Sequence, residues 1–154
     1  MLDLVHLVRS LDRGDVRYVL IGGVAVGVHG YVRMTMDLDL VPDPDRPNLE
    51  RLVATLSRLE GTLPGAAGRA FDPATDAGGL RRGGNLTLDT PRGGIDVVQR
   101  LPGVPPYAEL AAAADEVKLD GLPVLVCSLG HLRAMKVAAD RPQDRADLAG
   151  LPET

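Results

Sequence analysis

"RMTMDLDLVPD", the stretch from Arg33 to Asp43, places two aspartates two residues apart among mostly apolar neighbours. In a β-strand, residues i and i+2 lie on the same face, so Asp37 and Asp39 would point the same way from a segment that otherwise has the pattern of a buried strand. Like charges at this spacing repel each other, and burying them is costly unless something positive neutralises them. The pattern therefore indicates either a solvated strand end or a site for a divalent cation such as Mg²⁺, which binds a few carboxylate oxygens and also takes phosphate oxygens.

The composition is typical of one globular domain. The chain has 154 residues, of which 45% are hydrophobic and 25% are charged, and we expect a single domain over residues 1–154. A formal net charge of −4 argues against strong, unspecific binding to nucleic acid or to a membrane surface. A single cysteine, Cys127, fits a reducing compartment, and no apolar run is long enough to span a bilayer. We expect a cytoplasmic protein with no membrane partner.

Helical and strand patterns follow each other without a regular βαβ repeat. Apolar residues at helical spacing predict helices at about residues 4–14, 24–30, 47–59, 129–139 and 143–151, with Ser128 as the N-cap of the fourth. Runs rich in β-forming residues predict strands at about residues 16–23, 36–41, 85–90, 94–99 and 122–128, the third and fourth forming a hairpin. Residues 61–84 have the composition of a long loop, and residues 107–117 that of a short helix or loop. The predicted fold class is α+β or α/β, a small mixed β-sheet flanked by helices.

Three further features favour a metal and phosphate site. Gly22 and Gly23 follow a strand and precede a helix, where glycine lets the backbone approach a phosphate, although a turn with positive φ would also use such a pair. Asp96 lies inside a short apolar strand, as a metal ligand or as a charge on an edge strand. Lys136 shares a helical face with apolar residues, so it points toward a phosphate or the acids unless its ammonium group reaches the surface.

These residues carry a family resemblance. "IGGVAVGVHGYVRMTMDLDLV" (residues 21–41), followed by "IDVV" (residues 95–98), resembles the nucleotidyltransferase superfamily that includes DNA polymerase beta. That signature has Gly-Gly or Gly-Ser after a hydrophobic residue, Asp-x-Asp about a dozen residues later, and a later aspartate on a strand. More narrowly, "R-x-T-x-D-L-D-L" together with "MKVAADRPQDRADL" (residues 135–148) looks like the toxin-type nucleotidyltransferases of abortive-infection and toxin–antitoxin systems. The resemblance implies a minimal nucleotidyltransferase fold, in a chain with little room for the helical domain with which larger relatives hold an acceptor.

The resemblance implies a role for the acids and the glycines. Asp37 and Asp39 would bind Mg²⁺ or Mn²⁺ that bridges the triphosphate of a nucleotide. Asp96 would hold a second metal ion or act as the base for the attacking hydroxyl. Gly22 and Gly23 would leave space for the phosphates and donate N–H groups to them.

Two residues just before the aspartates are further candidates for nucleotide binding. Arg33 and Thr35 would lie on the strand face of Asp37 if the strand extends back that far, and either would contact phosphate. Arg33 has an alternative partner in Asp39.

The C-terminal motif implies both nucleotide-binding and structural residues. Lys136 and Arg141 would neutralise the triphosphate or hold the acceptor. Asp144 and Asp147 are three residues apart on a predicted helix and are therefore neighbours. We expect this pair to have a structural role by binding arginines near the site.

We therefore expect a metal-dependent nucleotidyltransferase that moves a nucleoside monophosphate from a nucleoside triphosphate, with ATP among the candidates, to a hydroxyl. The acceptor would be an RNA or tRNA end, a protein side chain or a small molecule, and a toxin–antitoxin component would have a cognate antitoxin protein as partner. The alternative is a non-catalytic nucleotide-binding module that senses nucleotide or regulates a partner protein. Arg81 and Arg82, in the predicted loop, are expected to close over phosphate or acceptor.

Two other interpretations fit less well. A haloacid-dehalogenase-like phosphatase would have its first aspartate directly after an N-terminal hydrophobic strand, where this chain has Gly22 and Gly23. The stretch "GGVAVG" is not Gly-x-Gly-x-x-Gly and no suitable acid follows it, so dinucleotide binding is not favoured.

Overall fold

A computed structural model describes all 154 residues and contains one six-stranded sheet with the strand order β3-β4-β2-β1-β6-β5. The strands are β1 (Tyr18–Ile21), β2 (Asp37–Pro42), β3 (Leu86–Thr90), β4 (Gly93–Val97), β5 (Asp115–Leu119) and β6 (Leu122–Val126). β2 is parallel to β4 and β1 is parallel to β6, whereas the other neighbours are antiparallel. The expected α+β fold with a small mixed sheet is confirmed.

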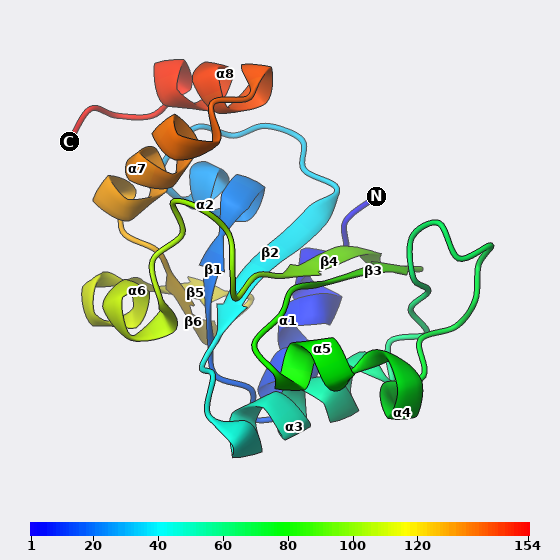
Figure 1. The fold of residues 1–154 in the computed structure, drawn as a ribbon. Helices are drawn as coiled ribbons and strands as arrows, with labels where there is room; N and C mark the ends of the chain where they lie inside the picture. The colour runs from blue at the N-terminus through cyan, green and yellow to red at the C-terminus, as the bar shows by residue number, and fades with distance from the viewer.

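Eight helices surround the sheet: α1 (Leu4–Arg13), α2 (Gly22–Val28), α3 (Arg46–Leu56), α4 (Pro73–Asp76), α5 (Gly78–Arg81), α6 (Tyr107–Ala113), α7 (Leu129–Ala139) and α8 (Pro142–Gly150). α7 packs against α8 and α2 at the top of the view in Figure 1, whereas α3, α4 and α5 lie at the bottom. None of the helices has the length and apolar character that a membrane-crossing segment requires.

The longer helices begin with side-chain caps that the sequence supplies. Ser128 accepts a hydrogen bond from a backbone N–H in the first turn of α7, as predicted, and Asp3 and Asp45 do the same for α1 and α3. Each cap satisfies a backbone donor that a helix start otherwise leaves without a partner.

The core is built on the two central strands. Leu20 of β1 and Leu38 and Leu40 of β2 are fully buried, and they pack in one cluster with leucines of α1 and α3. Full burial of such a side chain contributes about 1.5–3 kcal/mol relative to exposure. β2 is therefore held in the middle of the sheet at every second residue, and this anchorage fixes the direction of the aspartates between its leucines.

Residues 61–84 differ from the predicted long loop. They contain α4 and α5, and they bury Phe71, Ala77 and Leu80 in the main core. Residues 61–72 contain no helix and only isolated β-bridges, so the prediction was wrong for residues 73–81. A few well-spaced apolar residues suffice to dock the segment against α3, although glycine, proline and arginine dominate its composition.

Residues 107–117 contain the predicted short helix, but they also begin a strand that was not predicted. They divide between α6 and the start of β5, which pairs with β6 in an antiparallel hairpin. Its turn consists of Asp120 and Gly121, with φ of +51° and +80°. Asp-Gly between two extended runs is a strong hairpin signal, and it would have identified this strand.

Candidate active site

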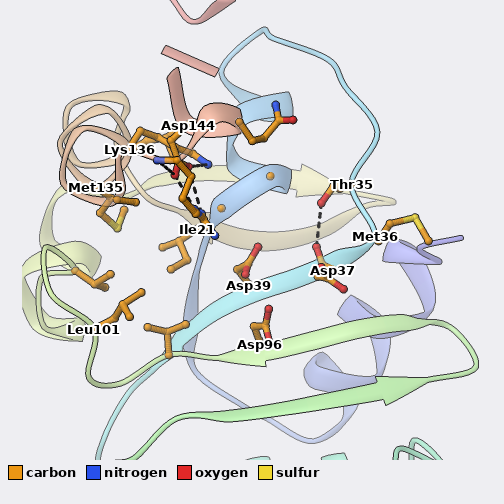
Figure 2. A pocket seen from close by; sticks show the side chains of 18 of the residues that line it. Ile21, Thr35, Met36, Asp37, Asp39, Asp96, Leu101, Met135, Lys136 and Asp144 are labelled. Atoms are coloured by element: carbon orange, nitrogen blue, oxygen red, sulfur yellow. Dashed lines mark hydrogen bonds and ion pairs between the residues drawn. The ribbon is translucent and has the colours of Figure 1, made fainter. Parts of the chain in front are cut away.

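The three aspartates selected from the sequence lie on two neighbouring parallel strands. In the β2–β4 pair, Asp39 is opposite Asp96 and Asp37 is opposite Gly94. Paired residues point to the same face of a sheet, and so do residues two apart, so the three carboxylates share one face. Figure 2 shows their side chains on β2 and β4 beside one another. The fold thus brings together acids that are 57 residues apart along the chain, between positions 39 and 96.

Two glycines provide the room that these carboxylates occupy. A Cβ atom on Gly22 would collide with the carboxylate of Asp39, and one on Gly94 would collide with that of Asp37. Gly22 also has a φ of +66°, which residues with a side chain rarely adopt. The turn between β1 and α2 therefore needs glycine both for its backbone conformation and for its close approach to β2.

The residues just before β2 do not lie on its face, because the strand begins only at Asp37. Thr35 packs on Gly23, where an added Cβ would be 2.6 Å from its Oγ1, and its hydroxyl donates to the backbone carbonyl of Asp37 at 3.3 Å. Arg33 turns toward α8, and the alternative that it pairs with Asp39 is wrong.

A buried ion network lies on the other side of the site. Nζ of Lys136 is 2.9 Å from Oδ1 of Asp144 and 2.8 Å from Oδ2 of Asp147. Arg33 donates to both oxygens of Asp147 at 2.6 and 2.9 Å, and Arg141 donates to both oxygens of Asp144 at 2.7 and 3.2 Å. Three cations and two fully buried carboxylates leave one net positive charge. Asp144 and Asp147 bind arginines, as expected.

The network keeps its two carboxylates ionised. Burial acts to raise the pKa of Asp144, but hydrogen bonds from Arg141 and Lys136 outweigh it and hold that pKa well below its ordinary value. Burial acts on the pKa of Asp147 in the same way, and hydrogen bonds led by those from Arg33 and Lys136 bring it to about 2. The network is therefore stable as an ionic unit at neutral pH.

The two predicted cations of the C-terminal motif are placed differently. Lys136 is only 6% exposed, so its ammonium group does not reach the surface, and both of its partners belong to α8. The side chain of Arg141 is 71% exposed. Arg141 is therefore accessible to an anion in solution, whereas Lys136 is held by carboxylates.

The aspartates on the sheet have no such partners. No lysine or arginine forms an ion pair with Asp37, Asp39 or Asp96. Burial raises the pKa of Asp39 to about 7, with further contributions from the charges of Asp96 and Asp37. Burial also raises the pKa of Asp37, as do the charges of Asp96 and Asp89. The face carries uncompensated negative charge.

A cavity of about 600 Å³ lies between these aspartates and the ion network. Nine candidate site residues from the sequence line the cavity: Gly22, Gly23, Arg33, Thr35, Asp37, Asp39, Asp96, Lys136 and Arg141. One end of its wall is apolar and comes from the segment after β4 and from α7: Leu101, Pro102, Val104, Leu132 and Met135. The cavity is therefore lined by carboxylates on one side, by cations on another and by apolar side chains at one end.

Thr87 is a polar residue of the site that was not selected from the sequence. Thr87 of β3 lines the cavity, and its hydroxyl donates to Oδ1 of Asp96 at 2.6 Å. Thr87 and Asp96 are direct neighbours across the β3–β4 hairpin. The sequence predicted the hairpin but not which residues of its two strands pair. Knowledge of that pairing would have placed Thr87 opposite Asp96.

The predicted role of Arg81 and Arg82 is wrong. Arg81 donates to both carboxylate oxygens of Glu50 at 2.9 and 3.2 Å. α5 packs on α3 at the bottom of Figure 1, and neither arginine lines the cavity. Arg81 precedes Asp96 by only 15 residues in the sequence, but α5 holds it away from the cavity.

The donor set fits a divalent cation in an open site. No three carboxylate, imidazole or thiol side chains lie close enough together to enclose a metal ion by themselves. Carboxylate oxygens are the ligands that Mg²⁺ and Mn²⁺ accept, and Mg²⁺ usually keeps several positions for water and substrate phosphates. A cation here would be held by fewer than three of these carboxylates, such as Asp37 and Asp39 together or Asp96 alone, and would take its other oxygens from substrate or water.

The fold has known counterparts among solved structures. No protein-family model matches the chain, and no curated protein matches it in sequence. A candidate nucleotidyltransferase from Thermotoga maritima matches 97% of this chain and 93% of its own, with 13% identity and a TM-score of 0.58. An antigenic nucleotidyltransferase-like protein from Paracoccidioides brasiliensis matches 95% of this chain and 72% of its own, with 19% identity and a TM-score of 0.60.

An antibiotic-resistance factor is a third counterpart. The resistance factor ANT(2'')-Ia matches 95% of this chain and 79% of its own, with 18% identity and a TM-score of 0.58. A second structure of ANT(2'')-Ia, in complex with adenylyl-2''-tobramycin, has a TM-score of 0.50 at 15% identity. The expected likeness to the nucleotidyltransferase superfamily is therefore confirmed at the level of the fold.

Proposed function

We propose that this protein is a metal-dependent nucleotidyltransferase, which transfers a nucleoside monophosphate from a nucleoside triphosphate to a hydroxyl acceptor. One observation carries the proposal: three aspartates without cationic partners line one cavity with a cationic network, in a fold shared with nucleotidyltransferases. Uncompensated acids that burial and mutual repulsion keep at high energy are a recognised mark of a functional site.

The aspartates would hold the metal ion in this mechanism. Asp37 and Asp39 would hold one cation, and Asp96 would hold a second or accept the proton of the acceptor hydroxyl. Bound cations supply Lewis-acid stabilisation of the entering and leaving oxygens of an in-line displacement. The net positive charge of the ion network lies across the cavity from these acids and would attract the triphosphate between the two.

The remaining residues would position the nucleotide. Arg141 is exposed at the cavity and would contact phosphate directly, and Gly22, Gly23 and Thr35 would shape the phosphate space. Arg33 and Lys136 already have carboxylate partners, so we assign them chiefly to holding α8 beside the site and maintaining positive charge there.

A small-molecule hydroxyl is the acceptor that we favour among RNA, protein and small molecules. ANT(2'')-Ia, whose complex contains adenylyl-2''-tobramycin, has the same fold and exceeds this chain only modestly in length. The net charge of −4 also gives no support for broad electrostatic capture of RNA. A toxin–antitoxin role with a cognate antitoxin, a preference for ATP and a cytoplasmic location remain predictions from the sequence.

The test is incubation of the purified protein with each labelled nucleoside triphosphate, with Mg²⁺ or Mn²⁺, and with RNA, protein or small molecules from a cell extract. We expect label in one acceptor fraction, its loss with EDTA, and its loss in Asp39→Asn. Arg81→Ala is the matched control and should keep full transfer, because Arg81 is bound to Glu50 away from the cavity. Transfer that persists in Asp39→Asn would overturn the assignment of the site.

The second candidate function is a non-catalytic nucleotide-binding module. It is favoured by the observation that two of the three cations beside the cavity, Arg33 and Lys136, are already paired with buried carboxylates and are therefore less available to a reacting triphosphate. This function predicts Mg²⁺-dependent nucleotide binding with no labelled product in any acceptor fraction. Isothermal titration beside the labelling assay separates the two functions.

A further inference from the structure

The hydrogen bond between Thr87 and Asp96 connects an edge strand to the aspartates that line the cavity. Thr87 is opposite Asp96 in the β3–β4 pair, and Asp96 is in turn opposite Asp39 in the β4–β2 pair. The three side chains therefore form a row across one face of the sheet. Oγ1 of Thr87 donates to Oδ1 of Asp96 at 2.6 Å, a short bond of the kind that a hydroxyl forms with a carboxylate.

This hydroxyl has no other hydrogen-bond partner in the protein. Thr87 is exposed, and β3 is an edge strand of the sheet. The residues on either side of it along β3, Leu86 and Leu88, are those that pack on the core. Valine has nearly the shape of threonine and is equally suited to a strand. Stability thus gives no reason for a hydroxyl at this position.

The three aspartates are held differently. Asp37 and Asp39 accept no hydrogen bond from any side chain, whereas Asp96 accepts one from Thr87. Asp39 is held instead by burial and by a hydrogen bond from the backbone N–H of Gly23, and Asp37 packs against Gly94. The last torsion of an aspartate side chain is broad and two-fold, so the carboxylate of Asp96 would rotate more freely without the bond from Thr87. The bond to Oδ1 limits this rotation and leaves Oδ2 as the oxygen without a protein donor.

We propose that Thr87 is a positioning residue, which holds Asp96 by one oxygen so that the other is presented to the metal ion or to the acceptor hydroxyl. This inference rests on the proposed function, because it assigns a task to Asp96. Partners that orient metal-binding carboxylates typically affect metal affinity or activity by about 10- to 100-fold. The contribution of Thr87 should lie at the lower end, because Asp37 and Asp39 remain in place.

The test compares the wild type with Thr87→Val, Thr87→Ser and the control Thr62→Val. The control removes a hydroxyl beside the same strand that reaches only the backbone carbonyl of Asp89, at 3.5 Å. Mn²⁺ affinity is measured without nucleotide by electron paramagnetic resonance, and kcat and KM for the nucleotide by the labelling assay. Thermal unfolding in EDTA checks that the four proteins are equally folded.

Thr87→Val should lower Mn²⁺ affinity or kcat by about 10-fold, with KM for the nucleotide unchanged. Thr87→Ser, which keeps the hydroxyl, should have the wild-type Mn²⁺ affinity and kcat. The control Thr62→Val should also match the wild type in both. Wild-type affinity and kcat in Thr87→Val, or a defect of equal size in Thr87→Ser, would overturn the role of Thr87 while leaving the proposed function intact. A wild type that binds no Mn²⁺ and transfers no label would overturn both.

Discussion

Asp39 is the residue whose protonation depends most on its surroundings. It is largely buried, it lies opposite Asp96, and it follows Asp37 by two residues, so three effects disfavour its ionised form. No lysine or arginine pairs with it. A residue in this state makes the folded protein less stable than an apolar or amide side chain would, unless a cation is bound.

The pH dependence of stability should reveal Asp39. The folded pKa of about 7 lies above the ordinary value of 3.8, so the folded state holds more protons between these values, and stability falls as pH rises through them. The loss is at most on the order of 4 kcal/mol, at about 1.4 kcal/mol per pKa unit. In EDTA, Asp39→Asn should show a flatter profile above about pH 4.5 and be at least as stable as the wild type near pH 8.

Thermal unfolding of both proteins across this range checks the prediction. If Asp39→Asn melts well below the wild type in EDTA at neutral pH, Asp39 is a structural hydrogen-bonding residue. In that case the proposed metal site is misplaced.

Substitutions at Lys136 and at Arg141 should affect the free energy of unfolding and the affinity for nucleotide to different degrees. Lys136→Met leaves two buried carboxylates with one cation fewer, and breaking a buried ion pair in this way costs about 3–5 kcal/mol. Arg141→Gln removes an exposed guanidinium, so it should weaken nucleotide binding more than it affects folding. Urea unfolding and nucleotide titration of both variants measure the two effects.

The opposite pattern would reverse the assignment. A Lys136→Met variant with wild-type stability and poor nucleotide binding would identify Lys136 as a phosphate-binding residue, as the family resemblance implies.

At the scale of elements, α8 is attached to the domain mainly by charge. Its buried residues are two aspartates, Asp144 and Asp147, and their partners come from α7, from the segment before β2 and from Arg141 at the start of α8. α5 is attached in the opposite way, through Leu80, which is fully buried in the main core. The two helices are thus held mainly by different interactions, α8 by ion pairs and α5 by burial of a leucine.

Leu80 should be essential for the packing of residues 61–84. Leu80→Ala removes a fully buried side chain and should lower the free energy of unfolding by about 2–5 kcal/mol. In the wild type, the amides of Arg81, Arg82 and Gly84 should exchange slowly, because they donate to backbone carbonyls in this segment. Denaturant unfolding and hydrogen exchange measure these effects. A small loss in Leu80→Ala, with rapid exchange of these amides, would restore the prediction of a long loop.

At the scale of the whole molecule, the order of the strands assembles the site. The cavity collects residues 21–39, 85–104 and 132–144, which are far apart in the chain. β2 lies between β1 and β4, so the turn after β1 and the third aspartate on β4 flank the Asp-x-Asp strand on its two sides. The acids then share one side of the cavity and the C-terminal helices supply the cations.

Ligand binding should therefore stabilise the entire domain. Mg²⁺ or Mn²⁺ should raise the melting temperature, and a nucleoside triphosphate should raise it further. A ligand at 100 times its Kd stabilises the folded state by about 2.7 kcal/mol. Asp39→Asn should lose most of this response, whereas Arg81→Ala should keep it. An equal response to metal and nucleotide in Asp39→Asn and the wild type would place the ligands elsewhere.

The sequence by itself determined the parts of the site that depend on local periodicity. The spacing of Asp37 and Asp39 placed both on one face of a strand, and the apolar residues around them placed that strand in the core. Gly22 and Gly23 identified the turn after β1, and Ser128 identified the start of α7. Each of these inferences needs only the geometry of one element, and that geometry is set by residues a few positions apart.

Only the tertiary structure decided which charges meet. Arg33 and Asp147 are 114 positions apart, so neither the pairing of Arg33 with α8 nor the burial of Lys136 between two aspartates follows from local spacing. The same holds for Thr87, whose partner depends on the register of a hairpin, and for Arg81, which α5 carries away from the site. A charged side chain pairs with whichever opposite charge the packing of the core leaves within reach, and that packing is a property of the whole chain.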